Sequence, residues 1–293
     1  MLRKDSKMKI LGIGDNVVDR YINKRIMFPG GNAVNFAVYA KQCGEDSAYL
    51  GNIADDEEGK LVYNSLSELS VDVSGSPLKT GDATERCDVR LDDGDRVFVG
   101  CEYGERGEEA WHPMVIVPEH IEYISSFDVI HCGCYAAMED EIKKLEDIEA
   151  VKTYDFSAEE EYRTDEYLEK VCPYIDIALF SAAETGMENM KNYVSKALMM
   201  GTKMVLVTDG TKGQKLWYNG EVFTGVVKKV EPVDTMGAGD SFFTAFVVAV
   251  MRAGFGKGNV LKKDDIDAAF SYAADFSAKT CLVEGAFGFG TKY

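Results

Sequence analysis

Residues 234–242 read Asp-Thr-Met-Gly-Ala-Gly-Asp-Ser-Phe, and this string is the most informative part of the chain. An apolar stretch follows from Phe242 to Met251, so the string predicts a loop that opens into a buried helix. The main-chain N–H groups of Gly237, Ala238 and Gly239 can converge on an anion, because bulky side chains are missing there. The start of the helix adds unpaired N–H groups and a positive dipole end. The string therefore predicts an anion-binding turn.

Asp240 comes directly after this turn. A carboxylate beside bound negative charge is electrostatically costly unless it has a chemical task. The obvious task is to take a proton from a hydroxyl group that attacks a phosphoryl group. The alternative is an ordinary tight turn in which Asp240 caps the helix. The first interpretation predicts a small-molecule kinase.

Composition limits the classes of function. The chain has 293 residues, and 46% of them are hydrophobic, enough for one large α/β domain or two small ones. A net charge of −18 argues against general affinity for nucleic acid or for anionic membranes. No signal segment follows the N-terminal charges, and no apolar run is long enough to span a membrane. We therefore expect a soluble, cytoplasmic protein.

The seven cysteines are scattered and include no Cys-x-x-Cys pair. With only three histidines in the chain, a zinc site has few possible ligands. We therefore expect buried free thiols in a reducing compartment.

Short apolar runs alternate with helix-length segments through most of the chain. Uniformly apolar, turn-bounded strands are typical of a sheet that is covered on both faces. The alternation predicts a doubly wound α/β fold with a mainly parallel sheet flanked by helices, and ligands at the carboxyl ends of the strands. The expected strands are 10–12, 48–50, 129–130, 177–180 and 204–207, and the expected helices are 33–43, 57–69, 139–148, 185–200, 241–253 and 266–279.

One segment interrupts this alternation. Residues 86–91 and 96–100 flank Asp-Asp-Gly-Asp, a strong signal for a hairpin turn. A hairpin does not join a parallel sheet easily, so we expect a small β lid from about 15–29 and 84–110; a surface hairpin without function is the alternative. No repeat or Pro-rich linker divides the chain, so residues 1–293 are assigned to a single kinase domain.

The whole string at 234–242 resembles the signature of the ribokinase-like carbohydrate kinases, of the phosphofructokinase-B type, and the resemblance runs from about Ile10 to Ala286. It implies the ribokinase-like version of the doubly wound fold. It also implies that Asp240 is the catalytic base and that Gly237, Ala238 and Gly239 form the anion hole.

Two further strings match the acceptor site of this family. Residues 14–19 read Gly-Asp-Asn-Val-Val-Asp after the first strand, and residues 29–35 read Pro-Gly-Gly-Asn-Ala-Val-Asn before a helix. Taken alone, these are a solvated polar loop and a turn with a helix cap. The resemblance implies that they bind the phosphoryl acceptor. The main ligands would be Asp19, Gly30, Gly31 and Asn35, and Asn16 would assist.

Residues 208–213 read Thr-Asp-Gly-Thr-Lys-Gly after an expected strand. A glycine-rich loop between strands is the plain interpretation. The resemblance implies a nucleotide loop in which Thr208, Gly210 and Gly213 contact ATP.

The resemblance also implies metal ions. Glu184 stands where many relatives have a Glu that organises Mg²⁺ through water, although Ser181 replaces their usual Asn. In relatives with a monovalent-cation site, an acid at the place of Asp234 and carbonyl groups near Gly285 supply the oxygens. The expected cofactors are therefore ATP and Mg²⁺, with K⁺ as a further candidate.

Several strings are similar to the fructoselysine kinase branch of the family: 14–16, 30–35, 95–98, 155–157 and 234–237. This similarity implies transfer of the γ-phosphoryl group of ATP to a primary hydroxyl of a fructosyl-amine such as fructoselysine. Acidic residues of the lid such as Glu102 and Glu105 are candidates to meet the amines. We expect a small sugar or fructosyl-amino acid as partner, and relatives imply a homodimer through the lid.

Other functions stay open. The chain could phosphorylate a plain sugar or a nucleoside, such as ribose, fructose or adenosine, or it could be a non-catalytic sugar or nucleotide sensor. A dinucleotide-dependent oxidoreductase is disfavoured because Gly12-Ile13-Gly14 lacks the third glycine of that fingerprint, and no P-loop string is present.

Overall fold

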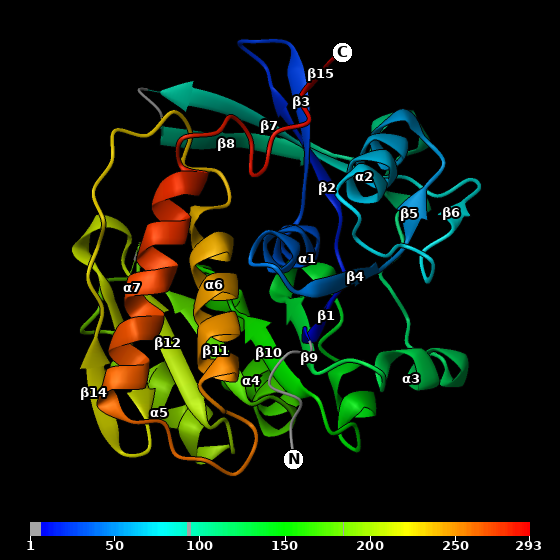
Figure 1. Ribbon diagram of the computed structural model, residues 1–293. Coiled ribbons are helices and arrows are strands. Elements are labelled where there is room, and N and C mark those ends of the chain that lie inside the picture. Colours follow the sequence, from blue (N-terminus) through cyan, green and yellow to red (C-terminus); the bar gives the residue numbers. More distant parts are fainter. Residues whose placement is uncertain (1–6, 93–94, 184) are drawn as a thin grey trace.

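The computed structural model describes residues 7–92, 95–183 and 185–293. Its largest element is an eight-stranded sheet in the order β14-β13-β12-β11-β10-β9-β1-β4 (Figure 1). The strands from β12 to β4 run parallel, and β13 and β14 are added antiparallel at one edge. Their bounds are β1 Lys9–Ile13, β4 Asp46–Leu50, β9 Val129–Gly133, β10 Val151–Asp155, β11 Ile177–Ser181, β12 Met204–Thr208, β13 Gln214–Tyr218 and β14 Glu221–Thr224.

Helices cover both faces of this sheet, which explains why its strands are apolar throughout. Successive residues of a strand point to opposite faces. In β12, Met204 and Leu206 belong to the core under α6 and α7, and Val205 and Val207 belong to the core on the other face. The helices are α1 Asn32–Gln42, α2 Glu57–Glu68, α3 Pro118–Ile124, α4 Asp165–Val171, α5 Lys191–Met199, α6 Ala238–Arg252 and α7 Lys263–Thr280. The expected doubly wound, mainly parallel fold is confirmed.

After β1 the chain enters a second sheet, which has the order β15-β3-β2-β7-β8. In Figure 1 it lies above α1, at the end of the molecule opposite the label N. The predicted hairpin is present as β7 and β8, with turn residues 93–94 outside the described part, and β7 pairs in parallel with β2. Its strands are β2 Val17–Tyr21, β3 Ile26–Gly30, β7 Glu85–Asp92, β8 Asp95–Glu102 and β15 Thr291–Lys292; β5 (Ile53–Ala54) and β6 (Leu78–Lys79) form a separate pair.

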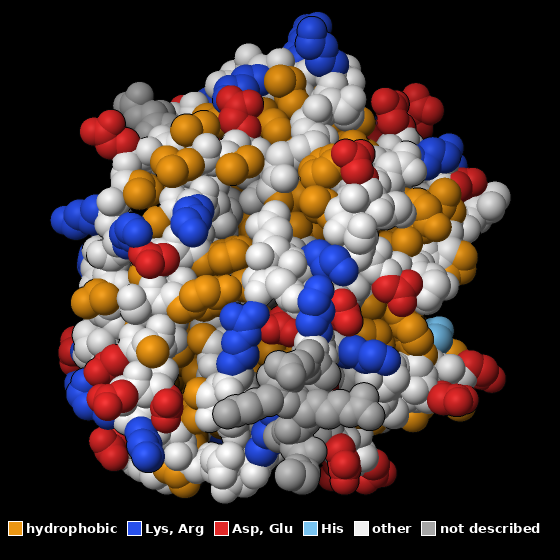
Figure 2. All heavy atoms as spheres, in the orientation of Figure 1, with side chains coloured by type: hydrophobic (Ala, Val, Ile, Leu, Met, Phe, Trp, Pro, Cys, Tyr) orange, Lys and Arg blue, Asp and Glu red, His pale blue; other side chains and the backbone are white. Residues whose placement is uncertain are grey.

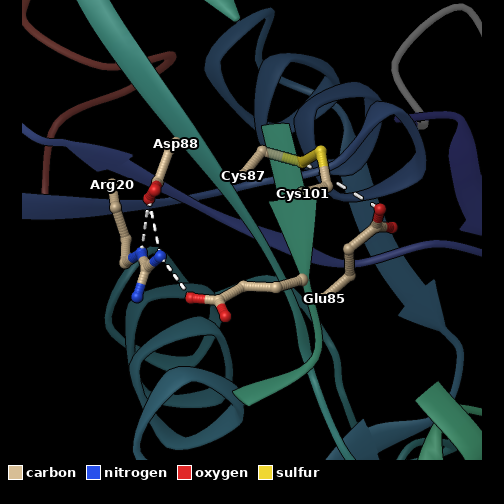
Figure 3. The surroundings of a disulfide bond; sticks show 6 residues. Arg20, Glu85, Cys87, Asp88 and Cys101 are labelled. Carbon is tan, nitrogen blue, oxygen red and sulfur yellow. Dashed lines mark hydrogen bonds and ion pairs between the residues drawn. A yellow bond between two sulfur atoms is a disulfide. The ribbon is translucent and has the colours of Figure 1, made fainter. Parts of the chain in front are cut away.

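The expectation that all cysteines are free thiols is wrong. Cys87 on β7 and Cys101 on β8 form a disulfide (Figure 3). The antiparallel register of the hairpin places the two residues opposite each other. Cysteines 14 positions apart can therefore form a disulfide although the sequence has no Cys-x-x-Cys motif. The other five cysteines are free and buried.

The helix expected at 139–148 is also wrong. This segment contains only a 3₁₀ turn, Ile142–Leu145. The buried apolar residues are Ile142, Leu145 and Ile148, at a spacing of three. Three residues per turn is the period of the 3₁₀ helix, and the α-helix needs 3.6. The shorter period explains why the segment does not continue as an α-helix.

None of the helices in the described part of the chain is both long and apolar enough to span a membrane. On the face shown in Figure 2, Lys and Arg side chains lie singly or in small groups among acidic and apolar ones.

Candidate active site

Polar residues gather at the carboxyl edge of the parallel sheet. Asp155 is the last residue of β10, and Ser181 and Thr208 are paired at the ends of β11 and β12. Asp15 follows β1, and its carboxylate accepts hydrogen bonds from the main-chain N–H groups that begin α1. The carboxyl ends of parallel strands meet at one edge, so distant parts of the sequence converge here.

The turn before α6 has the geometry that its glycines predicted. Gly237 caps the helix with φ 71°, a left-handed conformation that favours glycine. A Cβ there would lie 2.1 Å from Oη of Tyr39, so any side chain would clash. A Cβ at Gly239 would meet no described atom within 4 Å apart from its chain neighbours and the backbone of its own helix. The N–H of Ala238, the first residue of α6, donates to the carbonyl of Thr235 at 3.2 Å, and the space beside Gly239 is open to a ligand at the helix N-terminus.

Asp240 lies in the first turn of α6 and is held by two amides of α1. Nδ2 of Asn35 donates to its Oδ2 at 2.6 Å, and Nδ2 of Asn32 donates to its Oδ1 at 3.0 Å. Burial raises the pKa of Asp240, and the Asn35 hydrogen bond, the charge of Arg96 and the Asn32 hydrogen bond oppose that rise. A raised pKa moves the carboxyl group toward the range in which a general base works at neutral pH.

A chain of hydrogen bonds fixes the orientation of Asn32. Its Oδ1 lies 2.8 Å from Nε2 of His131, whose Nδ1 lies 2.9 Å from Oγ1 of Thr153. Burial lowers the pKa of His131 to about 3, so the ring is neutral and carries one proton. Since the Asn32 oxygen can only accept, that proton is on Nε2, and Thr153 donates to Nδ1. The Asn32 amide nitrogen is thereby directed at the carboxylates.

Asn32 also connects Asp240 with Asp155. The same Nδ2 lies 3.0 Å from Oδ2 of Asp155, whose Oδ1 accepts from the N–H of Ser157 at 2.8 Å. Burial, with the charge of Asp240, raises the pKa of Asp155 to about 7. Two acids therefore share one amide at the centre of the site.

The predicted acceptor residues lie on the second sheet and on α1. Asp19 on β2 is 5% exposed. Burial raises its pKa to about 7, against the opposing charge of Arg96. Gly30 ends β3 close to this carboxylate, and Gly31 has φ 107° at the start of α1.

Two amide oxygens near these residues are buried without a hydrogen-bond partner. They are Oδ1 of Asn35 and Oδ1 of Asn16, whose nitrogens are both engaged. An unpaired buried acceptor is costly unless a ligand satisfies it. A polyol supplies the hydroxyl donors that such oxygens need.

Asp234 is fully buried, and its carboxylate accepts three hydrogen bonds. The donors are Oη of Tyr21 at 2.6 Å and the N–H groups of Gly285 at 2.8 Å and Met236 at 2.9 Å. It thus joins β2 to the segments before α6 and after α7. Binding of a monovalent cation by Asp234 remains a prediction.

The predicted nucleotide residues lie at the end of β12. Thr208 is the last residue of that strand, and Gly210 (φ 49°) and Gly213 (φ 108°) bound a 3₁₀ turn beyond it. Their contact with ATP remains a prediction. Glu184 lies outside the described residues, so its predicted role with Mg²⁺ has no structural account.

Sequence reasoning assigned no role to four residues of the site. These residues orient the carboxylates of Asp240 and Asp19 or change their pKa values, and they are Asn32, His131, Asp155 and Arg96. Arg96, on β8, also donates to the carbonyl of Thr235 at 3.0 Å. A histidine inside an apolar strand was the one signal that could have led to His131.

The chain is similar to known sugar kinases over nearly its whole length. The profile of the pfkB family of carbohydrate kinases matches residues 12–288. Fructosamine kinase FrlD of Bacillus subtilis (strain 168) is 34% identical over 287 residues, which cover 98% of this chain and 95% of that protein. Fructoselysine 6-kinase of Escherichia coli (strain K12) is 31% identical over 242 residues, 82% of this chain and 88% of that protein.

Solved structures agree on the fold. Fructokinase of Vibrio cholerae O395, with fructose, ADP and calcium ion bound, superposes with a TM-score of 0.76 at 21% identity, over 97% of this chain and 96% of that one. Ribokinase of Arabidopsis thaliana, complexed with ribose and ATP, has a TM-score of 0.72 at 20% identity, over 96% of this chain and 95% of that one. The predicted family and ribokinase-like fold are confirmed: this chain is a carbohydrate kinase of the pfkB family.

Proposed function

We propose that the chain transfers the γ-phosphoryl group of ATP to a primary hydroxyl of a fructosyl-amine such as fructoselysine, with Asp240 as the base. The observation that carries the proposal is the position of Asp240. Its carboxylate is held by Asn35 and Asn32 directly behind the turn formed by Gly237, Ala238 and Gly239.

In the proposed reaction, Asp240 accepts the proton of the acceptor hydroxyl while the oxygen forms a bond to the γ-phosphorus. The bond from that phosphorus to the bridging oxygen breaks, and ADP leaves with the electron pair. The N–H groups at the start of α6 hold the negative charge that develops on the phosphoryl oxygens. Asp19, Gly30, Gly31 and Asn35 orient the acceptor.

ATP is expected on the other side of the turn, against Thr208, Gly210 and Gly213. Mg²⁺, usually held by one or two carboxylates, waters and substrate phosphates, would neutralise charge on the phosphates. Glu184 is the proposed carboxylate for this role, and Asp234 is proposed for a monovalent cation.

The choice of acceptor rests on similarity. The two curated relatives described above are named for fructosamines and fructoselysine, and each is more than 30% identical to this chain. The solved structures named for fructose and ribose are only 21% and 20% identical. A fructosyl-amine is therefore the preferred acceptor class, and a plain sugar is the second.

We also propose that the second sheet acts as a lid and as a dimer surface. Its edge strand β8 exposes apolar side chains, with Phe98 53% and Val99 56% exposed. An apolar edge strand is a template for pairing with another chain. Sedimentation of the protein and of a Val99→Glu variant tests this, with a dimer expected for the first and a monomer for the second. A monomeric wild type would contradict the proposal.

The decisive experiment for the function is Mg²⁺-dependent ADP release from ATP with fructoselysine, another fructosyl-amino acid, fructose, ribose and adenosine as acceptors. Preference for fructoselysine would support the full proposal. Preference for fructose, ribose or adenosine would keep the mechanism and replace the acceptor. No stimulation by any acceptor would favour a sensor.

A further inference from the structure

A cavity of about 290 Å³ lies between the second sheet and the loops that follow β9 and β10, and aromatic rings line most of it. Tyr103 and Trp111 come from the segment after β8, and their ring centroids are 5.9 Å apart. Tyr135, Tyr162 and Tyr167 come from the opposite side, at 5.6 Å and 5.4 Å from one ring to the next. The cavity is thus a half-open pocket lined largely by aromatic rings.

Two carboxylates, Glu85 and Glu139, also line this cavity, and none of its lining residues in the described part of the chain is Lys or Arg. Glu85 is half-buried, and no described group donates a hydrogen bond to its carboxylate. Sγ of Cys87 lies 4.0 Å from its Oε1, but that sulfur is in a disulfide and has no proton to donate (Figure 3). The carboxylate of this half-buried residue is therefore available to a positively charged ligand group.

The cavity adjoins the acceptor site. In the parallel pairing of β2 with β7, Val17 lies opposite Glu85, and Asp19 lies opposite Cys87. Alternate positions share a face, so the carboxylates of Asp19 and Glu85 stand on the same face of the second sheet. The charges of Glu85 and of Asp240 both raise the pKa of Asp19, which places Asp19 within reach of each. The cavity is therefore the continuation of the acceptor site beyond Asp19.

Aromatic faces with nearby carboxylates are the chemistry that recognises organic ammonium groups. A phosphate or carboxylate ligand would be repelled by Glu85 and Glu139, and a neutral sugar would leave Glu85 without a charge partner. Burial raises the pKa of Glu85 to about 7, and a cation beside it would favour its ionised form. Arg20 and Arg86 of the second sheet, and Arg106 in the turn after β8, are engaged with Asp88, Glu102, Glu58 and Asp55.

We propose that this cavity binds the amine-bearing part of the acceptor: Glu85 pairs with the protonated amine attached to the sugar, and the rings enclose the chain that continues from that amine. This inference rests on the proposed function, and it explains physically why a fructosyl-amine would be preferred to a plain sugar. It also replaces the sequence prediction for the amines, because Glu102 is engaged by Arg20 and Arg86, and Glu105 does not line the cavity.

The test compares 1-amino-1-deoxyfructose, which is cationic, with fructose, which is neutral. Glu85→Gln is expected to raise KM for the amino sugar about tenfold or more, with kcat and the KM for fructose within about twofold of wild type. Trp111→Leu is expected to raise KM for fructoselysine more than for the amino sugar, since the ring contacts the longer chain. Glu105→Gln, in the turn after β8, is the matched control and should change the KM of neither acceptor.

Direct binding separates this inference from the proposed function. In a Trp217→Phe background, Trp111 is the single tryptophan, so its fluorescence reports binding of the amino sugar without ATP. Binding that Glu85→Gln weakens, without turnover, would keep the cavity assignment and overturn the kinase acceptor. Turnover of fructose with no preference for the amino sugar, or an equal rise of both KM values in Glu85→Gln, would overturn the cavity assignment alone.

Discussion

Nδ2 of Asn32 donates a 3.0 Å hydrogen bond to Oδ1 of Asp240, although 208 residues separate them in the sequence. A hydrogen bond to an ionised carboxylate favours the ionised form. Asn32 therefore opposes the effect of burial and keeps Asp240 able to accept a proton. Neutral His131 orients the Asn32 side chain. The pKa of Asp240 therefore depends on residues of α1 and β9 as well as on its own helix.

Replacement of Asn32 by Ala should move the acid limb of the kcat/KM profile to higher pH. Loss of the donor raises the pKa of Asp240 further, so a larger part of the enzyme carries a protonated base near neutrality. We expect kcat at pH 7 to fall by roughly tenfold, within the range of acid–base effects. The pH–rate profile checks this, with exposed Asn64→Ala as control. An unshifted acid limb would remove Asn32 from the tuning of Asp240.

Asp240→Asn should lower kcat by about 10²–10⁴-fold, which is the usual contribution of a general base. The amide has a similar shape but cannot accept the proton, and the main-chain donors of the turn remain. ATP binding measured by calorimetry should therefore persist. Asp264→Asn, at an exposed acid in the first turn of α7, is the matched control. Near-wild-type turnover of Asp240→Asn would exclude it as the base.

Asp19→Asn should stabilise the protein at pH 8 while it weakens acceptor binding. The folded protein holds the Asp19 proton more tightly than the unfolded chain, because the pKa is raised from 3.8 to about 7. The corresponding stability is present below about pH 4 and is lost as pH rises through about 7. Asn does not titrate. The free energy of unfolding of Asp19→Asn should therefore exceed that of wild type by on the order of a few kcal/mol at pH 8, and the difference should shrink toward pH 4.

Urea unfolding at pH 8, 6 and 4.5 measures this effect. Asp147→Asn, at an exposed position, should show no comparable pH-dependent gain. A constant difference between wild type and Asp19→Asn across these pH values would show that the Asp19 carboxyl does not titrate as described.

Thiol counting should find five reactive thiols in the unfolded, unreduced protein and seven after reduction. The difference is the Cys87–Cys101 bond, since the other five cysteines are free. The double variant Cys87→Ser with Cys101→Ser should give five under both conditions. Seven thiols before reduction would show that the hairpin is not cross-linked in the isolated protein.

The sequence predicted what depends on local composition. Uniformly apolar runs such as 204–207 identified the covered parallel sheet, and the glycines at 237 and 239 identified the turn before α6. These features are local, because strand periodicity and backbone freedom are properties of neighbouring residues.

Features that depend on contacts between distant segments could not be predicted. Asn32 meets His131 across 99 positions, and nothing in either neighbourhood specifies the other. The Cys87–Cys101 bond depends on the register of a hairpin. The cavity beside Asp19 is formed by separate segments whose tyrosines have no common spacing in the sequence.

The raised pKa values around the site have a consequence for the heat of ligand binding. Asp15, with a pKa of about 6, and Asp19, Asp155 and Glu85, each at about 7, retain part of their protons near neutrality. A ligand that brings hydroxyl donors or a positive charge favours the ionised carboxylates, so protons pass to the buffer when it binds. The enthalpy measured at pH 7 will therefore change with the ionisation enthalpy of the buffer chosen, and acceptor affinity will rise with pH across this range.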